Sequence, residues 1–297
     1  MYNKSKSSNQ EKIQAALDRI DNAVENINTD ADWLAFLAFS SKFYNYSARN
    51  TLLIYAQNPA ASYVKGYKAW NQLGRYVKKG AKGIAILAPC VKKVEEFTEP
   101  ENKAEYQDAE AEKVTKKVIT GFKTAYVFDI SDTDGSDEHL PVLVKGLAGS
   151  TEQEQQLYEN LKAYISTVHP VQEVTGTSSK GSYNLETSVI SIRADLESAQ
   201  KVKTILHEYA HSIDFARDPD ESISRNRREL VAESVAYVVS MRLGLDTSRY
   251  STGYIKSWLT DKDELKAVAD TVQKVASAIL SNLASSGIAA FADLKDE

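Results

Sequence analysis

The sequence predicts an α+β protein of two domains, and three observations lead to this prediction. Apolar residues recur at helical spacing near both ends of the chain. Between these regions, residues 118–130 are rich in β-branched and aromatic residues, which favours a strand, and a second strand is expected at residues 84–88. The turn-rich segment 131–141 then marks a boundary. We expect an N-terminal α+β domain over residues 1–140 and a mainly helical C-terminal domain with a small edge sheet over residues 141–297.

The composition is that of an ordinary soluble globular protein. Of the 297 residues, 42% are hydrophobic and 26% are charged. The chain contains no apolar run of about eighteen residues and no apolar stretch at its N-terminus, so we expect no membrane partner, no secretion and a cytoplasmic location. The single cysteine, Cys90, excludes an internal disulfide.

The charge divides sharply along the chain. Residues 1–93 carry a net charge of +8 and residues 94–297 carry −13. A basic half of this kind favours a polyanionic partner.

The first half begins with helices and continues with strands. We expect helices over residues 10–28, after Asp30 and over 47–58. A short strand over 63–67, a helical turn over 68–74 and a turn over 80–83 should follow. The next strand, 84–88, should continue past Pro89 and Cys90 and pair with 118–130. Residues 95–112 hold eight acids and one lysine without an apolar period. This acidic insertion predicts a solvated hairpin tip or a mobile loop.

The second half is mainly helical. We expect helices over residues 152–168, 196–211, 227–243 and 267–283, and a hairpin over 183–193 that turns at Glu186 and Thr187.

The sequence His207-Glu208-Tyr209-Ala210-His211 has the H-E-x-x-H pattern of zinc hydrolases. Residues four apart share one face of a helix, so His207 and His211 can bind one cation while Glu208 lies beside the open position. Glu208 would then act as the general base on a bound water. The alternative is that the pattern occurs by chance on the protein surface and binds no metal.

The third metal ligand must come from elsewhere, and the helix over 227–243 carries Glu229 and Glu233 on one face. We assign Glu229 as the ligand and Glu233 as the carboxylate that fixes an imidazole, because zincins with a glutamate ligand use this order. The residues alone leave the reverse order open. Nitrogen and oxygen ligands favour Zn²⁺, and Mn²⁺ or another divalent metal is compatible with them. Tyr254 is a candidate hydrogen-bond donor to the reacting oxygen, with simple packing as the alternative.

Residues 42–93 favour a nucleic-acid partner. They contain ten Lys or Arg and no Asp or Glu, interleaved with aromatic residues. Basic side chains attract a phosphate backbone, and exposed rings stack on unpaired bases, so the pattern favours single-stranded over duplex nucleic acid. For any single tyrosine, a place in the core is the alternative. The candidate DNA-binding residues are Lys42, Tyr46, Arg49, Asn50, Lys65, Tyr67, Lys68, Trp70, Arg75, Lys78, Lys79 and Lys82.

Taken together, these motifs resemble the ArdC family of antirestriction proteins and the related LtrC-like proteins of conjugative plasmids and transposons. The N-terminal likeness runs through residues 45–50, 66–70, 73–80 and 126–130. The C-terminal likeness is His207 to His211 with Glu229 to Glu233, which the ImmA/IrrE peptidases share.

The resemblance implies an N-terminal domain that binds single-stranded DNA without much sequence preference and a zincin-like metallopeptidase domain after it. It also implies a bacterial protein encoded on a mobile element that protects incoming plasmid DNA from host restriction. The acidic insertion at 95–112 departs from the family pattern and can shield one rim of the DNA surface.

Two rival functions remain open. One is a regulatory peptidase of the ImmA/IrrE kind that cleaves a repressor as its protein substrate. The other is a DNA-binding protein in which the metal is purely structural.

Overall fold

A computed structural model describes residues 2–98, 112–140, 151–220, 222–248 and 261–288. Helices dominate these residues, and the strands form three small sheets among them, which confirms the predicted α+β class. None of the described helices combines the length and the apolar character that crossing a lipid bilayer would take.

The N-terminal helices begin at polar caps. Helix α1 spans Tyr2–Glu25, α2 spans Asp30–Ser40 and α3 spans Ala48–Gln57. Thr29 and Asp32 form a capping box at the start of α2, and the Ser47 hydroxyl accepts from the Asn50 amide at the start of α3. The first helix therefore begins earlier and ends three residues sooner than the predicted range of 10–28.

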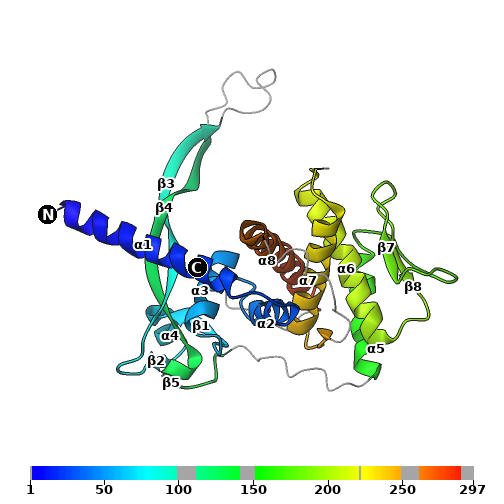
Figure 1. Cartoon of the computed structure of the whole chain (residues 1–297), viewed down its shortest axis with the longest axis horizontal. Coiled ribbons are helices and arrows are strands. Elements are labelled where there is room, and N and C mark those ends of the chain that lie inside the picture. The colour runs from blue at the N-terminus through cyan, green and yellow to red at the C-terminus, as the bar shows by residue number, and fades with distance from the viewer. Residues whose placement is uncertain (1, 99–111, 141–150, 221, 249–260, 289–297) are drawn as a thin grey trace.

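Two long strands form a ribbon that projects from the helical body (Figure 1). Strand β3 spans Ile84–Thr98, β4 spans Glu112–Asp129 and the short β1 spans Val64–Gly66. They pair antiparallel in the order β1-β4-β3, with Ile84 opposite Val127. The predicted pairing is confirmed. Both strands run into the acidic insertion, so the expected hairpin tip is shorter than 95–112, and residues 99–111 lie outside the described residues.

Side-chain amides from α3 cover the outer edge of β3. The Leu87 amide donates to Asn50 Oδ1 at 2.9 Å, and Asn50 Nδ2 donates to the Leu87 carbonyl at 3.0 Å. Gln57 makes the same pair of bonds with the backbone of Ala85. Because a bare strand edge invites pairing with another chain, these two amides stand in for the missing neighbour.

A small second sheet lies at the base of the ribbon. Helix α4 spans Tyr67–Gln72, β2 spans Arg75–Val77, the turn η1 spans Ile130–Asp132 and β5 spans Thr133–Gly135. Strands β2 and β5 pair antiparallel, so the turn-rich segment at 131–141 contains a strand that its composition did not predict. The Arg75 side chain holds the pair together by donating to Thr133 and to the Gly135 carbonyl.

The C-terminal part begins with helix α5, Thr151–Ile165, followed by the strands β6, Val171–Val174, β7, Gly181–Tyr183, and β8, Ile190–Arg193. Strands β7 and β8 form the predicted hairpin. Strand β6 adds in parallel on the other side of β8, which the sequence did not predict. Strand β7 therefore forms an edge of this sheet.

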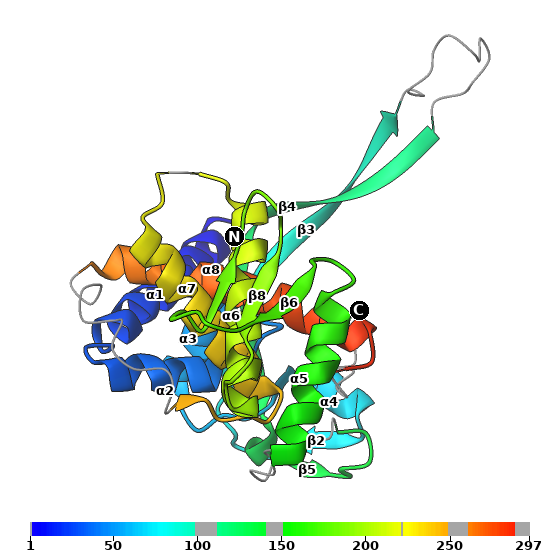
Figure 2. The ribbon, with the colours of Figure 1, turned by 90° about the vertical axis from the view of Figure 1, so that its right-hand side faces the viewer.

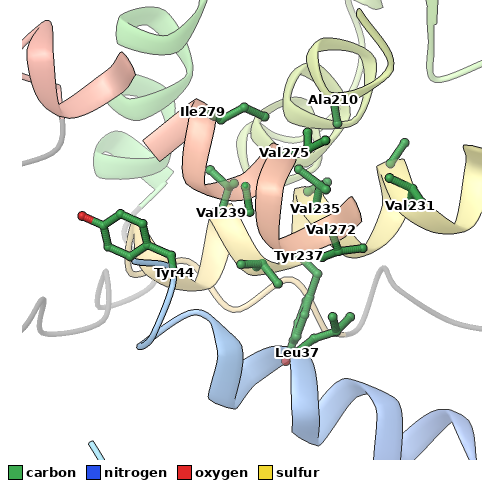
Figure 3. Close-up of a cluster of buried hydrophobic side chains, with 14 of the residues drawn as sticks. Leu37, Tyr44, Ala210, Val231, Val235, Tyr237, Val239, Val272, Val275 and Ile279 are labelled. Carbon is green, nitrogen blue, oxygen red and sulfur yellow. The ribbon is translucent and has the colours of Figure 1, made fainter. Parts of the chain in front are cut away.

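Three long helices complete this part: α6, Ser198–Arg217, α7, Arg225–Arg242, and α8, Lys262–Ser285. Their apolar faces meet one another and α2 in a single core, to which Leu37, Ala210, Val235 and Val275 contribute (Figure 3).

The core joins the two halves of the chain. Trp33 Nε1 of α2 donates to the Ser234 hydroxyl of α7 at 3.1 Å, and Gln273 Nε2 of α8 donates to the Phe43 carbonyl at 2.8 Å. Both bonds are buried. The division at residues 140 and 141 stays a prediction, and the helices on either side of it share one apolar core.

Candidate metal centre and nucleic-acid surface

The central helix of the C-terminal part holds the H-E-x-x-H motif rigidly. Ile205, Leu206 and Ala210 of α6 are fully buried, so one side of the helix faces the core. His207, Glu208 and His211 lie on the side that faces a cleft. The packing of the apolar residues thereby fixes the direction of the polar ones.

His207, His211 and Glu229 lie close enough to share one cation. Each offers one ligand atom, and these atoms lie within 4.8 Å of one another. The two Nε2 atoms are 3.1 Å apart, His207 Nε2 is 3.3 Å from Glu229 Oε2, and His211 Nε2 is 3.7 Å from Glu229 Oε1. In a tetrahedron with bonds of about 2.05 Å the ligand atoms lie about 3.4 Å apart. The donor set and its spacing fit a divalent metal.

Glu233 lies on the other side of the His207 ring. Its Oε2 is 3.2 Å from His207 Nδ1, and its Oε1 accepts from the ammonium group of Lys203. Glu229 thus lies near Nε2 of His207 and Glu233 near Nδ1, and their roles as metal ligand and supporting carboxylate stay a prediction. His211 has no such support: its Nδ1 is buried without a hydrogen-bond partner among the described residues.

The carboxylates set the charge of the site. Burial lowers the pKa of His207, but hydrogen bonds with Glu229 and Glu233 outweigh it and raise that pKa to about 9. Hydrogen bonds with His207 and His211 hold the pKa of Glu229 well below its ordinary value. Burial raises the pKa of Glu208. The site therefore concentrates negative charge toward the two imidazoles, and Glu208 is shifted toward the range of a general base.

The motif opens into a cleft of about 950 Å³ between β7 and the helices α6 and α7. Its wall includes Ser182 and Leu185 from the hairpin, Phe215 from α6 and Ile223 from the loop between α6 and α7. The backbone of Tyr183 in β7 hydrogen-bonds with Glu208. An edge strand beside such a cleft can accept an extended peptide as a further strand.

The sequence alone did not reveal two residues of this site. A Cβ added at Gly181 would lie 2.6 Å from Thr204 Cγ2 and 2.8 Å from Glu208 Oε1, so only glycine lets β7 approach the helix so closely. Lys203 is 4% exposed and binds Glu233. Its position four residues before His207 was a signal, because residues four apart share a helix face.

Tyr254 lies outside the described residues, and its role as a hydrogen-bond donor stays a prediction.

The candidate DNA-binding residues fall into two groups. Five are engaged within the fold: Trp70 is fully buried, Lys65 and Arg75 are each 7% exposed, the Tyr46 hydroxyl donates to the Val64 carbonyl, and Asn50 covers the edge of β3. The others are exposed at the surface: Lys42, Arg49, Tyr67, Lys68, Lys78, Lys79 and Lys82.

Comparisons with known proteins give a family match for the N-terminal part of the chain. Residues 9–128 match the family model of the N-terminal domain of anti-restriction factor ArdC. An uncharacterized protein of Bacillus anthracis is 24% identical over 301 residues, which cover 92% of this chain and 51% of that protein. The chain thus spans about half the length of this curated relative.

Two crystal structures of the antirestriction protein ArdC from plasmid R388 are similar to this chain. The metal-free structure is 23% identical, with a TM-score of 0.49, and the match covers 81% of this chain and 86% of that one. The Mn(II)-bound structure is 20% identical, with a TM-score of 0.51, and the match covers 91% and 97%. The second match shows that the two chains share a fold.

Proposed function

We propose that this ArdC-like protein binds single-stranded DNA and a divalent cation and protects incoming plasmid DNA from host restriction. The metal site is the strongest support for this proposal. Two imidazoles and one carboxylate offer ligand atoms that lie within 4.8 Å of one another. The Mn(II)-bound state of the R388 ArdC protein supports a divalent cation here. The ligand types favour Zn²⁺ as well.

We also propose that the site supports peptide hydrolysis. A bound cation would polarise a water molecule and lower its pKa. Glu208 would accept a proton from an attacking water and pass it to the leaving amine, and its raised pKa supports this role. Glu233 would keep the His207 ring oriented through Nδ1.

A purely structural metal is the less favoured reading. Structural zinc sites are closed by four protein ligands, whereas this group of three ligands opens into a cleft of about 950 Å³. The cleft leaves room for a water molecule and a peptide beside the metal.

Glu208→Gln separates these functions. We expect metal-dependent cleavage of denatured casein to fall by about 10²- to 10⁴-fold. Metal content and affinity for an oligothymidine should stay unchanged, because Glu208 is not among the three ligands. Casein cleavage that is equal in the variant and the wild type would refute the catalytic role.

The same variant tests how the protein acts in the cell. The measurement is the transfer of an unmodified conjugative plasmid into a restricting host that produces either the wild type or Glu208→Gln. If the protein acts by covering DNA, the variant should protect as well as the wild type, whereas a regulatory peptidase should lose its effect. Equal transfer with and without the wild-type protein would refute antirestriction itself.

DNA binding has its own test. Affinity for an oligothymidine should fall steeply with salt, and Lys78→Glu with Lys79→Glu should weaken it, because both lysines are exposed. Binding that is independent of salt would contradict the proposal.

A further inference from the structure

The outer part of the β3–β4 ribbon projects from the helical body (Figure 2). Several apolar side chains of this strand pair are exposed. Val91 is 51% exposed, Ile119 58% and Phe122 47%. Neighbouring apolar side chains that remain exposed together are typical of an interaction site.

The strand register gathers these side chains on one face. Pro89 lies opposite Phe122, and Val91 lies opposite Ile119. Residues directly opposite each other point to the same face, and adjacent pairs two residues apart on β3 share that face. The next pair outward on this face is Lys93 and Lys117.

A β-bulge makes this arrangement possible. Ile119 and Phe122 are three residues apart, and in a regular strand such residues point to opposite faces. The register shifts between Cys90 and Val91, which leaves Thr120 as the extra residue. Its hydroxyl donates to the Cys90 carbonyl at 3.1 Å. The bulge thus brings Ile119 onto the face of Phe122. We call Pro89, Val91, Ile119, Phe122, Lys93 and Lys117 the ribbon face.

The charge along the ribbon favours a polyanionic partner. Its two strands contain six lysines and four acids. The acids lie at the ends of the strands, so residues 84–94 and 113–128 between them carry lysines alone. A second copy of the chain would bring the same lysines against each other, because a two-fold interface apposes identical patches. A phosphate backbone complements both the charge and the narrow shape of the ribbon.

We propose that the ribbon face is a base-stacking site for single-stranded DNA, in which Phe122 contacts an unpaired base and Lys93 and Lys117 hold the backbone. Tyr126 is 52% exposed and lies on the same face of β4, four residues nearer the helical body. The Leu87–Thr124 pair between the two rings packs toward the core, so Tyr126 offers a separate second ring. The proposal rests on the proposed DNA binding. It places base contacts beyond the candidate DNA-binding residues, which lie between Lys42 and Lys82 and of which Trp70 is buried and unavailable for stacking.

The experiment measures binding of a fluorescent oligothymidine to the full chain as a function of salt. Phe122→Ala and Tyr126→Ala should each weaken binding by roughly tenfold and leave the salt slope unchanged, because stacking adds no counterion release. Lys93→Gln with Lys117→Gln should instead reduce the slope by about 0.7 for each lysine. Phe122→Trp should restore affinity.

Val168→Ala is the matched control, because Val168 is 55% exposed and lies after α5, away from the ribbon. It should bind as the wild type does. Thermal melting identifies any variant that has lost its fold. In that case, photocrosslinking of the wild type to an oligonucleotide with 5-iododeoxyuridine decides instead, with adducts expected on Phe122 or Tyr126.

The outcomes separate the two proposals. A wild type that ignores the oligonucleotide at low salt refutes DNA binding as a whole. A wild type that binds while the ring variants bind equally well, or adducts confined to residues 42–82, overturns the ribbon face alone. If the ring variants lose as much affinity for a DNA duplex as for the oligothymidine, base stacking is refuted. If the ring variants bind anionic lipid vesicles more weakly than the wild type but bind the oligonucleotide equally well, the ribbon face is a membrane-binding surface instead.

Discussion

The metal site on α6 and α7 and the β3–β4 ribbon differ in how firmly their side chains are held in place. At the site, partners fix the side chains in place, as Lys203 fixes Glu233 and Glu233 fixes His207. On the ribbon, Phe122 and Tyr126 are about half exposed, and bases can stack on such rings at many angles, so rigid support is not needed. Metal binding depends on exact distances, so its residues lie on helices that pack in the core. Base stacking tolerates variation in geometry, so its rings can lie exposed on the surface.

His211→Ala should have the largest effect. It removes one of three ligand nitrogens or oxygens, so affinity for Zn²⁺ or Mn²⁺ should fall by more than the roughly 10- to 100-fold typical of losing an outer partner. Isothermal titration calorimetry measures the affinity. The ribbon lies elsewhere, so oligonucleotide binding should not change. A variant with full metal affinity would show that the ligand set is wrong.

Lys203→Met tests whether the ion pair between Lys203 and Glu233 contributes to the stability of the metal site. Lys203 and Glu233 are both largely buried, and removing one partner of such a pair costs about 3–5 kcal/mol of unfolding free energy. Urea unfolding measures the loss. Lys203→Met with Glu233→Leu should regain stability and still bind metal weakly, since His207 Nδ1 keeps no acceptor. If the single variant is as stable as the wild type, the pair has no structural role.

The next largest effect should be a rise in apparent metal affinity with pH. The pKa of His207 is raised to about 9, so below that pH a proton occupies the ring and a metal must displace it. Apparent affinity should therefore rise about tenfold per pH unit between pH 7 and 9 and level off above. Titrations in buffers of different ionisation enthalpy count the proton released. Oligonucleotide binding should lack this step, which sharpens the contrast between the two regions.

Asn50→Ala should have the smallest effect and acts on the ribbon. It removes two hydrogen bonds to the backbone of Leu87, each worth about 1 kcal/mol. Hydrogen exchange at the Leu87 amide should become faster, while exchange in α6 stays slow. Asn71→Ala, on exposed α4, is the control. Unchanged exchange at Leu87 would mean that the edge does not depend on this amide.

The parts of the fold that were predictable have strong local signals. Helix α3 has a serine cap and ends before Asn58-Pro59, and the observed helix runs from Ala48 to Gln57. Strands β2, β5 and β6 were missed because three or four residues carry no measurable period. They form only because a partner strand, such as β8 for β6, is present.

The same distinction holds for functional residues. The spacing of His207 and His211 on one helix places both nitrogens, because helix geometry is regular. The basic segment had no such geometry, and Arg75 proved to be a structural link to Thr133 at 7% exposure. The ribbon face was invisible in the sequence, because the bulge at Thr120 reverses the alternation that a strand pattern assumes.

The bond from Trp33 to Ser234 links α2 to the helix that carries Glu229 and Glu233. A fragment that ended near residue 140 would expose the apolar side of α2, and a fragment that began there would expose that of α7. Neither half is built to be inherited or expressed alone. Removal of one activity without the other would therefore take substitutions at single sites rather than deletion of either half.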